Sequence, residues 1–72
     1  MSERETIAVR LNGDDREVDA GMTVLELLES LDLEPGLVVV ERNREILDRE
    51  RYGEVEVEAG DTLELVHFVG GG

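Results

Sequence analysis

The sequence closes on three consecutive glycines, Gly70, Gly71 and Gly72, directly after an apolar stretch. Glycine has no side chain, so an extended glycine segment can pass through a channel too narrow for other residues. With Gly72 as the last residue, its α-carboxylate is ionised at neutral pH, because the reference pKa is about 3.5. That oxygen can attack the α-phosphate of ATP to form an acyl-adenylate, which a sulfur or nitrogen nucleophile then displaces. The end of the sequence therefore predicts a C-terminal carboxyl group that can be activated by adenylation.

Few other side chains could carry chemistry. The chain has no cysteine, which excludes a disulfide framework, a thiolate nucleophile and a cysteine-ligated zinc site. The single histidine, His67, cannot by itself form a metal site or a catalytic triad, and we interpret it as a solvated or half-buried strand residue. A chain of 72 residues buries only about 60% of the surface it exposes when unfolded. We expect no catalytic residue, no metal site and no bound cofactor, and thus a protein on which partner enzymes act.

The charge balance limits the classes of partner that the chain can bind. Nineteen acidic residues face seven basic ones, all arginine, which gives a net charge of −12. This charge opposes binding to nucleic acid and to anionic membranes, and it either steers the chain to basic partners or keeps it soluble. No stretch is long and apolar enough to span a membrane. The N-terminal residues lack the apolar core of a signal peptide, so we expect a cytoplasmic protein.

The first part of the chain predicts a hairpin and a helix. Residues 6–11 alternate between apolar and polar side chains, which indicates a half-buried strand. Asn12-Gly13 is typical of a hairpin turn, and we expect Asp14 and Asp15 to lengthen this loop before a return strand at residues 16–19. Thr23 and Glu26 have capping-box spacing at the start of a helix. A stripe at i, i+3, i+4 and i+7 follows, formed by Val24, Leu27, Leu28 and Leu31.

The second part predicts further strands. We expect Pro35-Gly36 to end the helix, and residues 37–42 to form a strand with Val38 and Val40 pointing inward. A turn at Asn43-Arg44 leads into a brief strand around Ile46 and Leu47. Valines that alternate with glutamates at residues 54–58 suit an edge strand or an extended loop. Tyr52 is interpreted as a cap of the core.

The last strand is predicted at residues 62–69, with Leu63 and Leu65 buried. Val66 and Phe68 then point to the other face of the sheet, which one helix cannot cover. Such exposed apolar residues often mark an interface, and we predict that Val66, Phe68 and Val69 bind a partner. The alternatives are that a loop covers them or that they are scattered surface residues.

Taken over nearly its whole length, the sequence resembles the sulfur carrier of thiazole (thiamine) biosynthesis, within the ubiquitin-like β-grasp superfamily. The most specific segments are VERN at residues 40–43 and VHFV at residues 66–69. The resemblance also covers LNG at 11–13, GMTVLELLESL at 21–31, GDTLEL at 60–65 and the closing Gly71-Gly72. It implies an α+β fold of four to five mixed strands packed on one helix, in the order β-β-α-β-β-β. We therefore predict a domain at residues 1–69 and a flexible glycine tail at residues 70–72.

The resemblance also implies a reaction sequence. The terminal glycine of this family is adenylated by an E1-like, ATP-dependent adenylyltransferase and is then converted to a thiocarboxylate. The sulfur comes ultimately from cysteine, through a desulfurase or another sulfur source, and passes to thiazole synthase. Carried over to this chain, Gly72 bears the thiocarboxylate, Gly71 is the second residue of the motif and Gly70 is a spacer.

Other functions stay open from the residues alone. A carrier of the same chemistry could serve molybdopterin synthesis or tRNA thiolation. A ubiquitin-like modifier joined to target lysines through Gly72 also fits, although a chain without lysine cannot form polymers through its own side chains. A binding module with an inert terminus is the remaining alternative.

Overall fold

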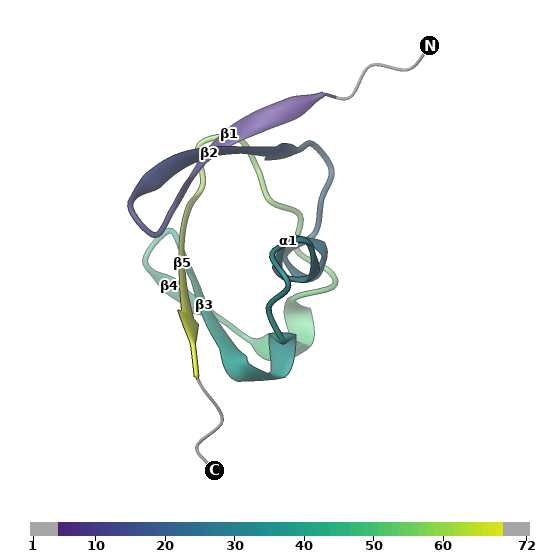
Figure 1. The fold of residues 1–72 in the computed structure, drawn as a ribbon, viewed down its shortest axis with the longest axis vertical. Helices are drawn as coiled ribbons and strands as arrows, with labels where there is room; N and C mark the ends of the chain where they lie inside the picture. Colours follow the sequence, from purple (N-terminus) through teal and green to yellow (C-terminus); the bar gives the residue numbers. More distant parts are fainter. Residues whose placement is uncertain (1–4, 69–72) are drawn as a thin grey trace.

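The computed structural model describes residues 5–68, which form a five-stranded mixed sheet with one helix packed against it (Figure 1). Six elements make up this architecture: β1 (Thr6–Leu11), β2 (Asp14–Asp19), α1 (Val24–Ser30), β3 (Val38–Arg42), β4 (Glu45–Leu47) and β5 (Thr62–His67). The strand order in the sheet is β2-β1-β5-β3-β4, so β5 is the central strand. It runs parallel to β1 and antiparallel to β3. The predicted β-β-α-β-β-β order is confirmed.

The β1–β2 hairpin turns on two residues. Asn12 and Gly13 both have positive φ, 50° and 87°, which suits the twist of a two-residue hairpin. Leu11 and Asp14 are register partners, so β2 begins immediately after Gly13. The prediction that Asp14 and Asp15 lengthen the loop was therefore wrong: the Asn-Gly pair completes the turn without them.

Helix α1 starts as predicted and ends earlier. The Thr23 N–H donates to Glu26 Oε1 at 2.9 Å, and the Glu26 N–H donates to Thr23 Oγ1 at 3.1 Å, forming the capping box. At the other end, Asp32 takes a φ of 60°, and the Leu33 N–H donates to the Leu28 carbonyl at 3.0 Å. This pattern is a Schellman cap. The helix thus ends before Pro35, which begins a separate 3₁₀ turn, Pro35–Leu37.

The core lies between the sheet and α1. Its fully buried side chains are all aliphatic: Val24, Leu27, Leu28, Val38, Val40 and Leu63. Tyr52 is 3% exposed, and its hydroxyl donates to the Val38 carbonyl at 2.8 Å and accepts from the Val40 N–H at 3.2 Å. The predictions that Val38 and Val40 point inward and that Tyr52 caps the core are confirmed.

The segment between Tyr52 and β5 is an extended loop, not a strand. One isolated bridge, Thr23 with Glu56, joins it to the start of α1. The Val57 N–H donates to the Met22 carbonyl at 2.8 Å, and the Val57 side chain is buried. Of the two predicted forms, the extended loop is confirmed and the edge strand was wrong. A second 3₁₀ turn, Arg49–Arg51, precedes this loop.

Strand β5 ends at His67, two residues earlier than predicted. The Phe68 N–H nonetheless donates to the Leu37 carbonyl at 2.8 Å, so the pairing with the segment before β3 continues by one residue. Among residues 5–68, no helix is long and apolar enough to cross a membrane.

Candidate functional site

The candidate site lies where the central strand leads out of the sheet. In Figure 1, the arrow of β5 points away from the β1–β2 hairpin. Val69, Gly70, Gly71 and Gly72 follow it and lie outside the described residues, so the roles predicted for them stay predictions. The structure shows which hydrogen bonds hold β5, the strand that precedes them.

The start of β5 is fixed by a buried carboxylate. Asp61 is 6% exposed, and its Oδ2 accepts hydrogen bonds of 2.9 Å from Arg42 Nε and from the Glu58 N–H. Its Oδ1 accepts a hydrogen bond of 3.1 Å from Asn43 Nδ2. Burial favours the neutral acid, but these three donors outweigh it and hold the pKa of Asp61 below its ordinary value. Asp61 therefore joins the β3–β4 hairpin to β5 as an anion.

Two turn asparagines bond the strand itself. Asn43 Oδ1 accepts from the Thr62 N–H at 2.9 Å, and Asn12 Oδ1 accepts from the Leu65 N–H at 2.8 Å. Strands β1 and β5 are paired only at Arg10–Thr62 and Leu11–Leu63. The Asn12 side chain therefore adds a hydrogen bond to β5 beyond the last paired residue of β1. The sequence indicated both asparagines as turn residues. Their bonds to β5 were missed because they join positions 19 and 53 residues apart.

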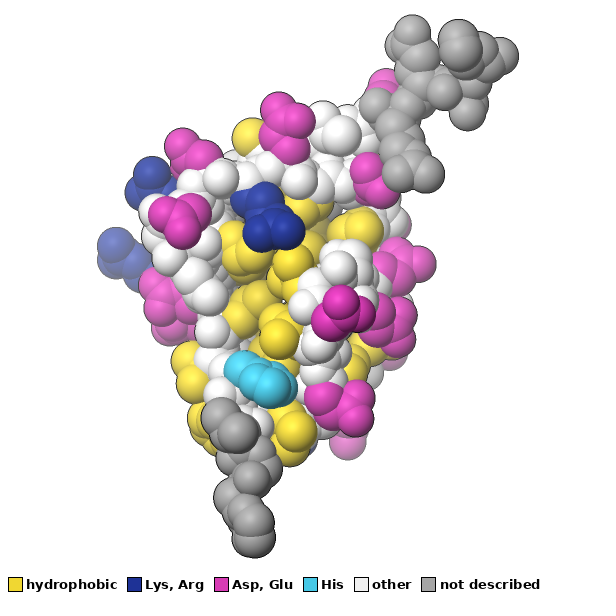
Figure 2. All heavy atoms as spheres, viewed as in Figure 1, with side chains coloured by type: hydrophobic (Ala, Val, Ile, Leu, Met, Phe, Trp, Pro, Cys, Tyr) yellow, Lys and Arg dark blue, Asp and Glu magenta, His cyan; other side chains and the backbone are white. Residues whose placement is uncertain are grey.

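The apolar residues expected beside the tail are exposed. Val66 is 53% exposed and Phe68 is 55% exposed, so the prediction that they lie on the uncovered sheet face is confirmed. Two further apolar residues, Val39 and Ile46, share this face by their register with β5 and β4. Leu37 is 38% exposed and lies beside Phe68, whose N–H donates to the Leu37 carbonyl. Figure 2 shows hydrophobic side chains next to the end of the described chain.

The sequence contained a signal for two of these additional residues, Val39 and Ile46. Val39 alternates with the buried Val38 and Val40, which places it on the opposite face of β3. Ile46 pairs with Glu41, the next outward position of β3. Leu37 required the structure, because it lies in a 3₁₀ turn outside any strand.

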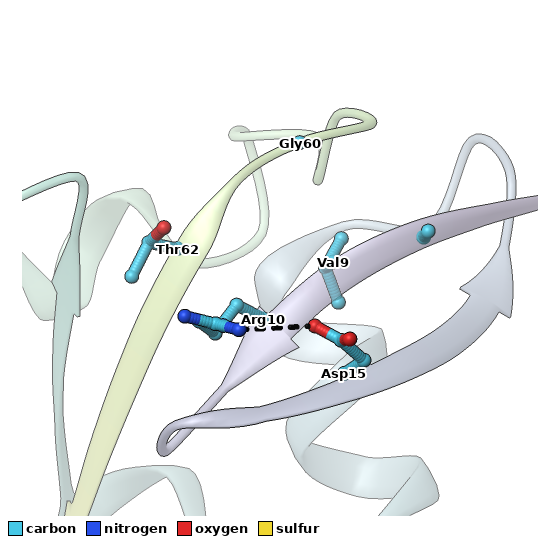
Figure 3. Close-up of a pocket in the computed structure, with 6 residues that line it drawn as sticks. Val9, Arg10, Asp15, Gly60 and Thr62 are labelled. Atoms are coloured by element: carbon cyan, nitrogen blue, oxygen red, sulfur yellow. Dashed lines mark ion pairs between the residues drawn. The ribbon is translucent and has the colours of Figure 1, made fainter.

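A shallow hollow elsewhere on the molecule carries no comparable chemistry. It lies between β1, β2 and the start of β5, beside Val9, Arg10, Asp15, Gly60 and Thr62 (Figure 3). Its ion pair, Arg10 to Asp15 at 3.5 Å, has both side chains more than half exposed, and such surface pairs contribute little to stability. Within the described residues, no group of three or more acidic or histidine side chains could hold a metal ion.

A comparison with protein families matches residues 9–72 to the ThiS family. The chain belongs to the ThiS family. It is 52% identical over 66 residues to the sulfur carrier protein ThiS of Bacillus subtilis, covering 89% of this chain and 98% of that protein. The family resemblance predicted from the sequence is confirmed, and so is the prediction that the chain is a carrier and not a catalyst.

Solved structures of ThiS proteins agree with the fold. The crystal structure of the thiamine biosynthesis protein ThiS from Geobacter metallireducens superposes with a TM-score of 0.76 at 36% identity, over 92% of this chain and 100% of that one. The solution NMR structure of a thiamine biosynthesis protein from the same organism gives a TM-score of 0.75, also at 36% identity, over 92% of this chain and 88% of that one. The ubiquitin-like β-grasp fold is confirmed.

Two larger proteins contain a segment similar to this chain. The thiazole synthase of Magnetococcus marinus is 42% identical over 64 residues, and that of Paramagnetospirillum magneticum is 47% identical over 62 residues. These matches cover 89% and 86% of this chain. The chain spans about a fifth of each thiazole synthase, 20% and 19%.

Proposed function

We propose that this member of the ThiS family carries sulfur for thiamine biosynthesis on the carboxyl group of Gly72, as a thiocarboxylate that it donates to thiazole synthase. The observation that supports this most directly is the family match, which runs through residue 72 and so includes the diglycine motif. The near-complete coverage of the Bacillus subtilis sulfur carrier supports the same alignment of the C-terminus.

The chemistry requires two displacement steps. A carboxylate oxygen of Gly72 attacks the α-phosphate of ATP, and pyrophosphate leaves with the electrons of the broken P–O bond. A sulfide equivalent then attacks the acyl carbon, and AMP leaves as the C–S bond forms. Because glycine has no β-carbon, its carbonyl is the least hindered of any residue and no stereocentre is present to be lost. This chain supplies the carboxylate, while ATP and sulfur are substrates of its partners.

The fold supports this role by fixing one end of a short tether. Asp61, Asn43 and Asn12 hold β5 by hydrogen bonds at its start and middle. Four residues, 69–72, separate Phe68 from the end of the sequence, and fully extended they reach about 14 Å. An enzyme that acts on Gly72 must therefore bind close to the end of β5, where Val66 and Phe68 are exposed. This geometry supports the proposal that Val66, Phe68 and Val69 contact partners.

Three partners follow from the proposal. Thiazole synthase is the sulfur acceptor, and the two thiazole synthases that contain a segment similar to this chain support this pairing. An E1-like adenylyltransferase activates the carboxylate, and a cysteine desulfurase or another sulfur source supplies the sulfur. We place these reactions in the cytoplasm.

A deletion strain tests the function. Cells that lack this protein should need the thiazole moiety of thiamine for growth, and the intact chain should restore growth without it. A chain that lacks Gly71 and Gly72 should be present at normal levels and fail to restore growth. A strain that instead needs molybdenum-cofactor products, or that grows equally well with the truncated chain, would contradict the proposal.

A further inference from the structure

The turn between β1 and β2 joins an asparagine to a glycine, a dipeptide that can modify itself. Asparagine is among the chemically labile residues of proteins, because the backbone nitrogen of the next residue can attack its side-chain amide. Gly13 favours this attack, since it has no β-carbon to hinder the approach. Asn12 and Gly13 are both exposed, so water reaches the turn. The chain has one other asparagine, Asn43, which precedes Arg44, and no glutamine.

Strand β5 holds Asn12 at two points. The Asn12 N–H donates to the Leu63 carbonyl at 2.9 Å, and Asn12 Oδ1 accepts from the Leu65 N–H at 2.8 Å. Both φ angles of the turn are positive, 50° at Asn12 and 87° at Gly13, as a two-residue hairpin turn requires. Attack by the Gly13 nitrogen on Asn12 Cγ closes a succinimide ring, and the side chain must rotate away from Leu65 to form it. The folded chain therefore keeps Asn12 in a conformation that opposes the reaction.

We propose that Asn12–Gly13 is a modification site that β5 protects, and that its isoaspartate product in turn loosens β5. The Gly13 nitrogen attacks Asn12 Cγ, the Cγ–Nδ2 bond breaks, and Nδ2 leaves as ammonia with the proton of the Gly13 N–H. Water then opens the succinimide. Opening at the side-chain carbonyl gives aspartate, whereas opening at the main-chain carbonyl gives isoaspartate, in which the backbone runs through Cβ. The reaction needs only water, so it is independent of the proposed function.

Isoaspartate alters the turn that holds the strand leading to the glycines. It adds the β-carbon to the backbone of the turn, and the former side-chain carbonyl becomes the carbonyl of the peptide bond to Gly13. The Leu65 N–H then loses the acceptor that Asn12 supplied, and the two-residue turn that sets the β1–β2 register is lost. Ordinary aspartate keeps a side-chain oxygen that can accept this bond. The two products therefore predict different stabilities.

Asn43 is an internal reference for the chemistry. It occupies the corresponding turn between β3 and β4, where Asn43 and Arg44 also have positive φ. Its Oδ1 likewise accepts from β5, from the Thr62 N–H at 2.9 Å. The difference lies in the next residue, because the Arg44 side chain hinders its backbone nitrogen. In the unfolded chain we expect Asn12 to react at least about tenfold faster than Asn43.

The test follows both asparagines by peptide mapping and mass spectrometry in mildly alkaline buffer, with and without concentrated urea. Conversion of Asn12 should be at least about tenfold slower in native buffer than in urea, because β5 must first open locally. In urea, Gly13→Ala should slow the conversion of Asn12 by about tenfold or more. Arg44→Gly is the matched variant: in urea it should bring the rate at Asn43 to within about twofold of that at Asn12.

The isolated product tests the effect on β5. Chains that carry isoaspartate are separated after incubation in urea and refolded beside the wild type and the Asn12→Asp variant. We expect the isoaspartyl chain to melt about 4 °C or more below the wild type and to exchange the Leu65 amide several-fold faster. Asn12→Asp should change both quantities less. The rate measurements need no refolding, so they test the site even if the isoaspartyl chain stays unfolded.

Each part of the proposal has an outcome that overturns it. Absence of conversion at Asn12 in urea overturns the modification site, and equal rates in native buffer and in urea overturn its protection by β5. An isoaspartyl chain with the melting temperature and the Leu65 exchange rate of the wild type overturns the effect on β5. None of these outcomes depends on sulfur transfer to Gly72, so the proposed function stands or falls separately.

Discussion

Asp61 and Arg42 form an ion pair of 2.9 Å that joins the start of the central strand to the β3–β4 hairpin. The carboxylate is nearly buried, with a side chain 7% exposed, whereas the arginine side chain is 26% exposed. The pair therefore lies at the border between core and solvent, directly before the strand that leads to the glycines.

Loss of this carboxylate should destabilise the fold. In Asp61→Ala, the Arg42 guanidinium, the Asn43 amide and the Glu58 N–H lose their common acceptor. Because hydrogen bonds to a charged group contribute about 1.5–3 kcal/mol, we expect the free energy of unfolding to fall by at least ~2 kcal/mol. Urea unfolding measures this difference. The control Asp14→Ala removes an exposed aspartate and should change stability by less than about 0.5 kcal/mol.

Asp61 should also account for part of the loss of folding stability at low pH. Its pKa is lowered from the ordinary value of 3.8 in the folded state, so the folded state binds fewer protons than the unfolded state near that pH. Its stabilising contribution is present above pH 3.8 and is lost as the pH falls through the lower, folded value. The urea midpoint of Asp61→Asn should therefore fall less steeply below pH 4 than that of the wild type. Parallel curves for the two proteins would contradict this role.

The Tyr52 hydroxyl should contribute measurably to the free energy of unfolding. The hydroxyl forms hydrogen bonds to two backbone groups of β3, the Val38 carbonyl and the Val40 N–H. Tyr52→Phe preserves the buried ring and leaves both groups without this partner. We expect a loss of about 1–3 kcal/mol in chemical denaturation. A loss below about 0.5 kcal/mol would mean that other groups or water replace the hydroxyl.

Asn12 should protect the middle of β5 through its side chain. Asn12→Gly retains the positive φ of 50° without strain and removes the acceptor of the Leu65 N–H. The amide of Leu65 should then exchange with solvent several-fold faster, as expected for a lost hydrogen bond of about 1 kcal/mol. Hydrogen exchange followed by NMR checks this, with the Val66 amide, which faces β3, as the internal reference. Equal acceleration of both amides would indicate general loosening and not a local bond.

Local signals in the sequence predicted most of the fold. Hydrogen bonds between residues that are far apart in the sequence could not be predicted. The alternation of Ile7, Val9 and Leu11 and the capping box of Thr23 and Glu26 each depend on near neighbours, and both are present in the structure. The end of α1 was misplaced because Asp32 adopts a left-handed conformation that its residue type permits but does not require.

The same distinction between local and long-range features applies to the candidate site. Val66 and Phe68 followed from strand alternation alone, and their exposure agrees with that prediction. The hydrogen bond from the Leu65 N–H to Asn12 Oδ1 depends on the alignment of two segments that are 53 residues apart in the sequence. A shift of one residue in that alignment would separate the two groups, so only the three-dimensional structure reveals this hydrogen bond.

The proposed function places the carried sulfur on the carboxyl group of Gly72. The most direct measurement is mass spectrometry of the C-terminal peptide after incubation with ATP, the activating enzyme and a sulfide source, for the wild-type chain and for a chain extended by one phenylalanine after Gly72. We expect one oxygen of Gly72 to be replaced by sulfur in the wild type, and no change in the extended chain. An unchanged wild-type mass with an active enzyme, or equal sulfur incorporation in the extended chain, would contradict it.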